Sequence, residues 1–349
     1  MRTGCFYSRL LSSAVLLILA AAVVSCGGGS SHNNSSTSNP GSGSNVQPVA
    51  VNSGPAHNYA NGLFTNLTVC VPGSSDCQTI TGILVDTGSY GLRLLSSAAG
   101  GALTLPLPTQ TVSSGNSVGE CASFVSGYTW GPVKAADITI SGENASDVPV
   151  QVIDPTFSSV PSGCANSGVP ADDTIQKLGA NGILGVGPYA QDCGGACTQT
   201  GSGNPGLYYG CASGSCQVIA ESLTQQVQNP VALFTTDSNG VIIELPALSG
   251  SAASMSGSMI FGIGTQANNA LGSAAIFPLN STGEFNTTFK GKTYPAFVDS
   301  GSNALFFLDG ATTGLTVVAI IRASIAQGQP PIFQRRPRPQ APARPSVSA

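Results

Sequence analysis

Residues 83–95 read ILVDTGSYGLRLL, and residues 296–308 read AFVDSGSNALFFL. Both segments share the pattern Val-Asp-x-Gly-Ser-x-x-Leu, in which the residue after Asp is Thr or Ser. A segment rich in Phe and Thr precedes each copy, at residues 62–68 and 283–289. Similar units at distant positions predict two related half-structures, each with an Asp that follows an apolar run.

The rest of the chain is typical of short β-strands and turns. Runs rich in Val, Ile, Thr and Phe lie at residues 63–71, 79–85, 136–140, 148–153, 241–245 and 259–263. Gly accounts for 44 of the 349 residues, as expected for a protein with many turns. The best helical pattern is Val218–Asn229, which is apolar at every fourth position and stops before Pro230. The sequence therefore predicts an all-β fold with minor helix.

The N-terminus has the pattern of an exported lipoprotein. Arg2 and Arg9 precede a short apolar segment at residues 10–24, and residues 23–27 read VVSCG. Basic residues, a short apolar run and small residues at its end are typical of a cleaved export signal. The Ser-Cys-Gly sequence resembles a bacterial lipobox, so we expect residues 1–25 to be removed and Cys26 to carry the lipid. The alternative is an ordinary cleaved signal with an incidental Cys.

The segment after the signal predicts a tethered module at a membrane. Residues 26–48 are rich in Gly, Ser and Asn and cannot bury apolar surface, which indicates a flexible tether. Lipid on Cys26 would anchor the protein to a membrane. Gly27 is not the Asp that retains some lipoproteins at the inner membrane, so we expect the outer membrane, facing the periplasm or the surface. A net charge of -4 gives no reason to expect nucleic acid as a partner.

The cysteines agree with an oxidising compartment. Eight Cys follow Cys26, namely Cys70, Cys77, Cys121, Cys164, Cys193, Cys197, Cys211 and Cys216. An even number in an exported protein predicts disulfides. Cys70 and Cys77 flank the turn-forming sequence VPGSSD, which predicts a hairpin loop closed by a bridge. The last four could instead form a zinc site, although their spacings are not those of the usual CxxC pair.

The repeated Asp-[Thr/Ser]-Gly-Ser motif resembles the two Asp loops of the pepsin-type aspartic peptidases. The resemblance implies an all-β, bilobal fold in which each lobe places one Asp at a shared cleft. Asp86 and Asp299, which are 213 residues apart, would be the catalytic pair. The residues that would support the two loops are Thr87, Gly88, Ser89, Ser300, Gly301 and Ser302.

This chemistry depends on two carboxyl groups at near-contact distance, which cannot both ionise and therefore share a proton. The ionised carboxylate takes a proton from a water molecule, and the other donates its proton to the scissile carbonyl. Gly in each loop lets the backbone approach and donate N–H groups to the carboxylate oxygens. The reaction requires no cofactor and no metal.

Three further segments match the same family. Residues 181–187 read NGILGVG and resemble the apolar-apolar-Gly element that passes behind the first Asp loop. Residues 119–140 occupy the place of the flap hairpin, in which Phe124, Tyr128 and Trp130 are each candidates to cover the substrate. A Cys121–Cys164 bridge would then tie the base of the flap to the next strand. Residues 256–262 resemble the strand that leads into the second lobe.

The chain also departs from the family. Arg93 lies where the family often has an aromatic residue. Only 50 residues follow Asp299, whereas the family needs about twice as many, including a second apolar-Gly element. We therefore expect an N-terminal lobe at 49–265 and a partial, truncated C-terminal lobe at 266–308.

An aberrant Pro/Arg-rich tail is expected at 309–349. Residues 322–349 carry five of the twelve basic residues and no acidic ones, which indicates either a lost reading frame or a tail that binds anionic surfaces.

The function expected from these features is that of an envelope-bound aspartic endopeptidase. The alternatives are a non-catalytic pepsin-fold module that binds a peptide or glycan, and an inactive truncated product. A Ser-His-Asp or Cys-His site would have to use His57, because the other His, His32, lies in the tether. More narrowly, the chain resembles the uncharacterised bacterial lipoproteins of the DUF3443 type, for which no function is implied.

Overall fold

The computed structural model describes residues 43–166, 168–303, 306–314 and 333–334. Twelve strands form the main sheet: β1 (Val46–Asn52), β2 (Gly62–Cys70), β3 (Cys77–Asp86), β4 (Tyr90–Leu95), β5 (Ser117–Ser123), β6 (Tyr128–Ile140), β7 (Glu143–Ile153), β8 (Gly182–Val186), β9 (Tyr208–Ala212), β10 (Ser215–Val218), β11 (Val241–Glu244) and β12 (Met255–Phe261). Their order across the sheet is β10-β9-β5-β6-β7-β4-β8-β3-β2-β1-β12-β11. The all-β class is therefore confirmed.

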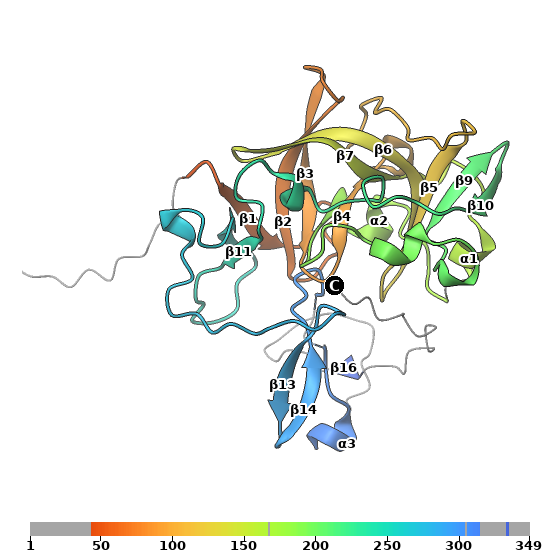
Figure 1. Ribbon diagram of the computed structural model, residues 1–349. Coiled ribbons are helices and arrows are strands. Elements are labelled where there is room, and N and C mark those ends of the chain that lie inside the picture. Colours follow the sequence, from red (N-terminus) through yellow and green to blue (C-terminus); the bar gives the residue numbers. More distant parts are fainter. Residues whose placement is uncertain (1–42, 167, 304–305, 315–332, 335–349) are drawn as a thin grey trace, which may run out of the picture. The chain divides into compact units, whose positions relative to one another are not determined.

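The middle of this sheet closes on itself. Besides its neighbours in the sheet order, β6 pairs with β2, so that Thr68 lies opposite Thr139. The strands β2, β3, β8, β4, β7 and β6 thus form a closed ring, and the β6–β7 ribbon crosses β2 and β3 in Figure 1. Closure removes the exposed edges of these strands and encloses the main core. Fully buried members of that core include Val69, Ile80, Leu92, Ile138 and Val150.

The C-terminal half of β3 is buried on both faces. Its first residues alternate between exposed and buried positions, whereas Ile83, Leu84, Val85 and Asp86 are all buried. The reason is that Ile83 and Val85 pack in the main core on one face, whereas Leu84 packs in a second core cluster on the other. β8 pairs with the edge of this part of β3 in parallel, from Ile83 opposite Gly182 to Asp86 opposite Gly185. β8 also pairs with β4 on its other side. The segment 181–187 therefore passes behind the first Asp loop, as predicted.

The predicted helix at Val218–Asn229 is wrong. Val218 ends β10, and the residues that follow form turns. The backbone N–H of Val227 donates to the Tyr208 hydroxyl instead of a helical carbonyl, and Leu223 is 43% exposed. The contacts of Val227 with the surrounding strands therefore decide the local structure. The weak apolar periodicity of the segment is not sufficient to form a helix.

Helices among the described residues are short. They are α1 (Ser162–Ala165), α2 (Ile175–Leu178) and α3 (Gly310–Thr313), together with five 3-10 turns. No helix in these residues is long and apolar enough to span a membrane. The expected signal peptide, Cys26 and most of the tether lie outside the described residues, as does most of the tail.

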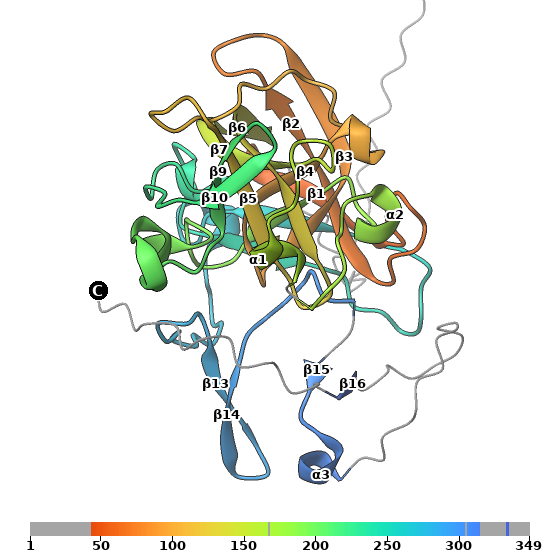
Figure 2. The same cartoon turned by 90° about the vertical axis from the view of Figure 1, so that its right-hand side faces the viewer.

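The second copy of the repeat begins with its own hairpin. β13 (Phe285–Phe289) and β14 (Lys292–Ala296) form a separate two-stranded sheet, visible as a blue ribbon in Figure 2. Asp299 lies three residues after the end of β14, whereas Asp86 is the last residue of β3 in the β2–β3 hairpin. A further short pair, β15 (Phe306–Phe307) and β16 (Phe333–Gln334), is parallel. Both copies of the repeat thus consist of a hairpin that leads into an Asp loop.

All eight cysteines that follow Cys26 form disulfides, as predicted. The pairs are Cys70–Cys77, Cys121–Cys164, Cys193–Cys197 and Cys211–Cys216. The hairpin bridge is confirmed, and the zinc alternative for the last four is wrong because they are paired with one another. Cys121–Cys164 joins β5 to α1 and not to the next strand.

Candidate active site

The two Asp loops lie in direct contact. A Cβ atom added at Gly88 would lie 2.8 Å from Cγ of Asp299, and one added at Gly301 would lie 2.6 Å from Cγ of Asp86. No side chain fits at these distances, so each loop requires Gly at the point where the opposite carboxyl group approaches. The structure therefore brings together the two Asp that the sequence singles out.

Reciprocal hydrogen bonds join the loops at Thr87 and Ser300. The backbone N–H of each residue donates to the hydroxyl of the other, at 3.1 Å from Thr87 and 3.0 Å from Ser300. The Thr87 hydroxyl donates to the Val298 carbonyl at 2.9 Å, and the Ser300 hydroxyl donates to the Val85 carbonyl at 2.8 Å. This twofold pattern explains why a hydroxyl residue follows Asp in both copies.

Backbone N–H groups hold one oxygen of each carboxylate. Gly88 donates to Asp86 Oδ1 at 2.8 Å, and Gly301 donates to Asp299 Oδ1 at 3.0 Å. Ser302 adds two bonds to Asp299, from its backbone N–H at 3.0 Å and from its hydroxyl to Oδ2 at 2.6 Å. The Ser89 hydroxyl, its counterpart, faces Asp86 but has no hydrogen bond of ordinary geometry.

The two carboxyl groups differ in environment. Asp86 is 7% exposed, whereas Asp299 is only half-buried. Burial raises the pKa of Asp86 to about 6, with a smaller lowering effect from Ser89 and a raising effect from the Asp299 charge. Burial therefore favours the protonated form of Asp86.

Tyr59 is a site residue that sequence reasoning missed. Its hydroxyl donates to the carbonyl of Gly301 in the second Asp loop. Burial raises the pKa of Tyr59 to about 12, and the charges of Asp86, Asp299 and Asp172 add to the effect. Tyr59 lies in the loop before β2, in a stretch without a distinctive motif, so no sequence pattern could have identified it.

The predicted flap is a hairpin of β5 and β6, with Cys121 opposite Trp130. Two of the three candidate aromatic residues are buried core residues: Tyr128 is 8% exposed and Trp130 is 3% exposed. The indole N–H of Trp130 also donates to the Ser158 carbonyl at 3.1 Å. Phe124 is half-buried near the tip and packs in the same cluster as Tyr59. Of the three, Phe124 alone has the position of a residue that could contact a ligand.

Asp172 is a second residue that the sequence did not reveal. Its carboxylate packs against Gly127 at the hairpin tip, where an added Cβ would lie 1.9 Å from Asp172 Oδ2. Its backbone N–H donates to the Tyr128 carbonyl at 2.7 Å. Burial raises the pKa of Asp172 to about 6, and the Asp173 charge adds to the rise. Asp172 thus lies within the electrostatic reach of Tyr59, as the Asp pair does.

A cavity of about 540 Å³ adjoins the second Asp loop. Its wall is mainly apolar, from Val51, Leu63, Ile243, Leu245 and Met255, and Ser300 and Ser302 contribute polar groups. Its volume falls in the range of small-ligand sites. Among the described residues, no three His, Cys, Asp or Glu side chains form a group that could hold a metal ion.

The raised pKa values predict that the protein is most stable in acid. Because the folded-state pKa values of Asp86 and Asp172, about 6, lie above that of an Asp in the unfolded chain, their stabilising effect is complete below about pH 4 and is lost as the pH rises through about 6. Asp86 alone accounts for a difference on the order of 2–3 kcal/mol. Urea unfolding at pH 4.5 should therefore give a higher midpoint than at pH 7.5.

Asp172→Asn supplies the control for this prediction, because it removes one titrating group outside the Asp pair. The dependence of the urea midpoint on pH should become shallower in this variant. A midpoint that is constant or higher at pH 7.5 in the unmodified protein would contradict the assignment of the raised pKa values.

No curated protein matches the chain. Among solved structures, the crystal structure of the aspartic proteinase from Irpex lacteus matches with 16% identity and a TM-score of 0.47, covering 78% of this chain and 69% of that one. This likeness concerns the fold alone. The family model "Protein of unknown function (DUF3443)" matches residues 41–325, and the chain therefore belongs to the DUF3443 family.

Proposed function

We propose that this protein is an aspartic endopeptidase that uses Asp86 and Asp299 as its catalytic pair. The observation that carries the proposal is the reciprocal lock between Thr87 and Ser300, which places the two carboxyl groups against each other. Such a lock has no evident purpose in a turn that serves only to join two strands. It does serve a reaction that needs one protonated and one ionised carboxyl group side by side.

In the proposed reaction, ionised Asp299 takes a proton from a water molecule between the two side chains. The water oxygen attacks the scissile carbonyl carbon, while Asp86 donates its proton to the carbonyl oxygen. The resulting tetrahedral gem-diol collapses, the C–N bond breaks, and the amine nitrogen receives the proton from Asp299. A new carboxyl group and a new amine form, and Asp86 regains a proton from the gem-diol.

The experiment is incubation of the purified full chain with an unstructured protein substrate between pH 3 and pH 8. Mass spectrometry should find internal fragments, with the highest rate below the Asp86 pKa of about 6, where Asp86 keeps its proton. If the folded protein yields no internal fragments at any of these pH values, the proposal is overturned.

The second candidate is a non-catalytic binding module for a peptide or glycan. The cavity of about 540 Å³ beside Ser300 and Ser302 favours it, because an apolar wall with a few polar groups suits ligand binding without reaction. An Asp86→Asn variant separates the two functions. Under this candidate, both the variant and the unmodified protein bind a labelled apolar peptide equally, and neither cleaves it.

We also propose that the protein is anchored in the bacterial envelope by lipid on Cys26. The support is the Ser-Cys-Gly sequence at the end of the apolar segment. When the gene is expressed in bacteria with radiolabelled palmitate, the chain and a Cys5→Ser control should both carry label. Cys26→Ser should carry none, and it should leave the detergent phase in a phase separation. Label that persists in Cys26→Ser would disprove the anchor.

A further inference from the structure

Arg93 lies in a buried cluster of charged groups that the proposed reaction does not use. It belongs to β4, is 2% exposed, and donates from Nη1 to the Tyr90 carbonyl at 2.7 Å. From Nη2 it donates both to Glu120 Oε1 on β5 and, at 3.0 Å, to Asp192 Oδ2 in the segment after β8. One guanidinium group thus connects three separate segments.

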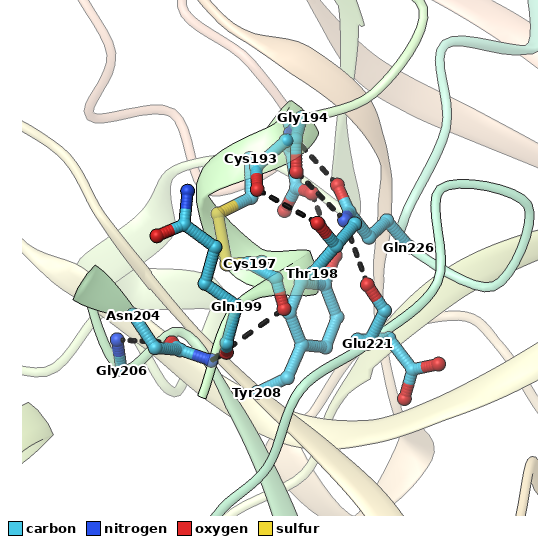
Figure 3. Close-up of a disulfide and its surroundings, with 12 residues drawn as sticks. Cys193, Gly194, Cys197, Thr198, Gln199, Asn204, Gly206, Tyr208, Glu221 and Gln226 are labelled. Atoms are coloured by element: carbon cyan, nitrogen blue, oxygen red, sulfur yellow. Dashed lines mark hydrogen bonds between the residues drawn. A yellow bond between two sulfur atoms is a disulfide. The ribbon is translucent and has the colours of Figure 1, made fainter. Parts of the chain in front are cut away.

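Tyr208 on β9 completes the cluster. Its hydroxyl donates to Asp192 Oδ1 at 2.6 Å and accepts the Val227 N–H at 2.7 Å. The segment that carries Asp192 is fixed by the neighbouring disulfide Cys193–Cys197, beside which Figure 3 shows Tyr208. The Gln226 side chain also exchanges two hydrogen bonds with the backbone of Gly194, at 2.8 and 3.0 Å (Figure 3). Asp192 therefore has little freedom to move away from Arg93.

The charges of the cluster do not balance if every group is ionised. Arg93 supplies one positive charge, whereas Glu120 and Asp192 would supply two negative ones, and all three side chains are at most 5% exposed. An uncompensated buried charge is costly. Burial raises the pKa of Glu120 well above its ordinary value; Arg93 opposes this rise, and Asp192 adds to it. The cluster is neutral when Glu120 holds a proton, and it carries one net negative charge when Glu120 loses it.

The position of the cluster links it to the candidate site. Tyr90 directly follows the first Asp loop, and its carbonyl accepts a hydrogen bond from Arg93. Glu120 lies on the flap hairpin, and the Arg93 guanidinium carbon is 5.7 Å from the centroid of the Phe124 ring near the hairpin tip. The same guanidinium group thus contacts the end of the loop that carries Asp86 and the hairpin that would cover a substrate.

We propose that Arg93 is a positioning residue that couples the first Asp loop to the β5–β6 hairpin through Glu120 and Asp192. The groups that face Glu120 and Arg93 come from β4, β5, the segment after β8, and β9, and their titratable members are Arg93, Glu120, Asp192 and Tyr208. Loss of the Glu120 proton leaves a net negative charge in the cluster. The hairpin is then released from the loop as the pH rises. The effect of this coupling on cleavage rests on the proposed function, but the coupling itself does not.

Hydrogen–deuterium exchange of the full chain tests the coupling without reference to activity. In the unmodified protein, amide protection in residues 117–134 should be about tenfold lower at pH 8 than at pH 5, after correction for intrinsic rates. Glu120→Gln keeps the size of the side chain and removes its proton equilibrium, so this difference should disappear. Arg93→Met should lower protection in the hairpin and in residues 86–95 at both pH values.

The matched control is Lys177→Met, which breaks the exposed Lys177–Asp173 ion pair and should change neither segment. Protection that stays the same in Arg93→Met overturns the proposal. A uniform loss over the whole chain, including β11 and β12, also overturns it, because Arg93 would then act only in global stability. If the pH effect persists in Glu120→Gln, the proposed coupling through Glu120 is wrong.

Kinetic measurements distinguish a failure of the coupling from a failure of the proposed peptidase function. If the unmodified protein cleaves peptides, Arg93→Met should raise KM or lower kcat by about tenfold, because a displaced hairpin no longer covers the substrate. Arg93→Lys should not restore the rate, since an ammonium group cannot reach Glu120, Asp192 and the Tyr90 carbonyl together. If no cleavage occurs at all, the proposed function fails while the exchange experiment still decides the coupling.

Discussion

Replacement of Asp86 with Asn should lower kcat/KM for peptide cleavage by about 10²- to 10⁴-fold. Asn matches Asp in size, so the Gly88 N–H keeps an acceptor at this position, and the lock between Thr87 and Ser300 remains. What Asn cannot do is donate a proton to the scissile carbonyl oxygen or share a proton with Asp299. The rate should therefore fall at every pH, while the urea midpoint at pH 7.5 changes little or rises, because a buried ionisable group is removed.

Asp299→Asn should cause a loss of similar size, because it removes the base that activates water. The double variant should be little worse than either single variant, since two groups that act as one unit do not contribute additively. Asp76→Asn is the matched control, because Asp76 lies exposed in the Cys70–Cys77 hairpin loop. If Asp86→Asn retained more than a tenth of the activity, Asp86 would not be a catalytic residue.

Removal of the Cys121–Cys164 disulfide should cost about 4 kcal/mol of unfolding free energy, which is the largest stability effect expected from a single bridge here. The bridge closes a loop with a sequence separation of 43, and both sulfur atoms lie in a cluster with Tyr128, Trp130 and Tyr209. Its main effect is to restrict the unfolded chain, and this effect grows with loop length. Ala is the suitable replacement, because a Ser hydroxyl would be buried without a partner.

The comparison for this prediction is the Cys70–Cys77 bridge, with a sequence separation of only 7. Its removal should cost about 2.5 kcal/mol by the same loop-entropy argument. Urea unfolding of both double-Ala variants at one pH provides the measurement. Equal losses from the two bridges would show that loop length does not control their contribution. The bridge at Cys121, which lies within the β5–β6 ladder and not at its base, would then add no more than the short one.

Local patterns in the sequence were sufficient to place most of the main strands. Apolar residues that alternate with polar ones indicate a strand with one covered face, and a continuous apolar run indicates a strand with both faces covered. The two halves of β3 show both cases. The helix expected at Val218–Asn229 failed because an apolar residue at every fourth position does not by itself ensure that these residues are buried together. Val227 is buried and Leu223 is exposed, which only the contacts of the surrounding strands decide.

The candidate site also contains residues that the sequence identified and a choice that it left open. The sequence singled out Asp86 and Asp299 because the same short motif occurs twice, and a repeat can be recognised without knowing where its copies lie. It left the flap residue open among Phe124, Tyr128 and Trp130. In the structure Tyr128 and Trp130 are buried, whereas Phe124 is half-buried and packs against a core cluster.

The sequence by itself thus determined the all-β class, the paired Asp loops, the Gly-rich strand behind the first loop and the Cys70–Cys77 bridge. Each of these depends on residues that are close in the chain or identical between two copies. The tertiary structure alone decided that Tyr59 reaches the second Asp loop and that Arg93 shares its charge between Glu120 and Asp192. Arg93 is 27 residues from Glu120 and 99 from Asp192. Pairings over such separations arise from strand order and burial, which local residue patterns do not encode.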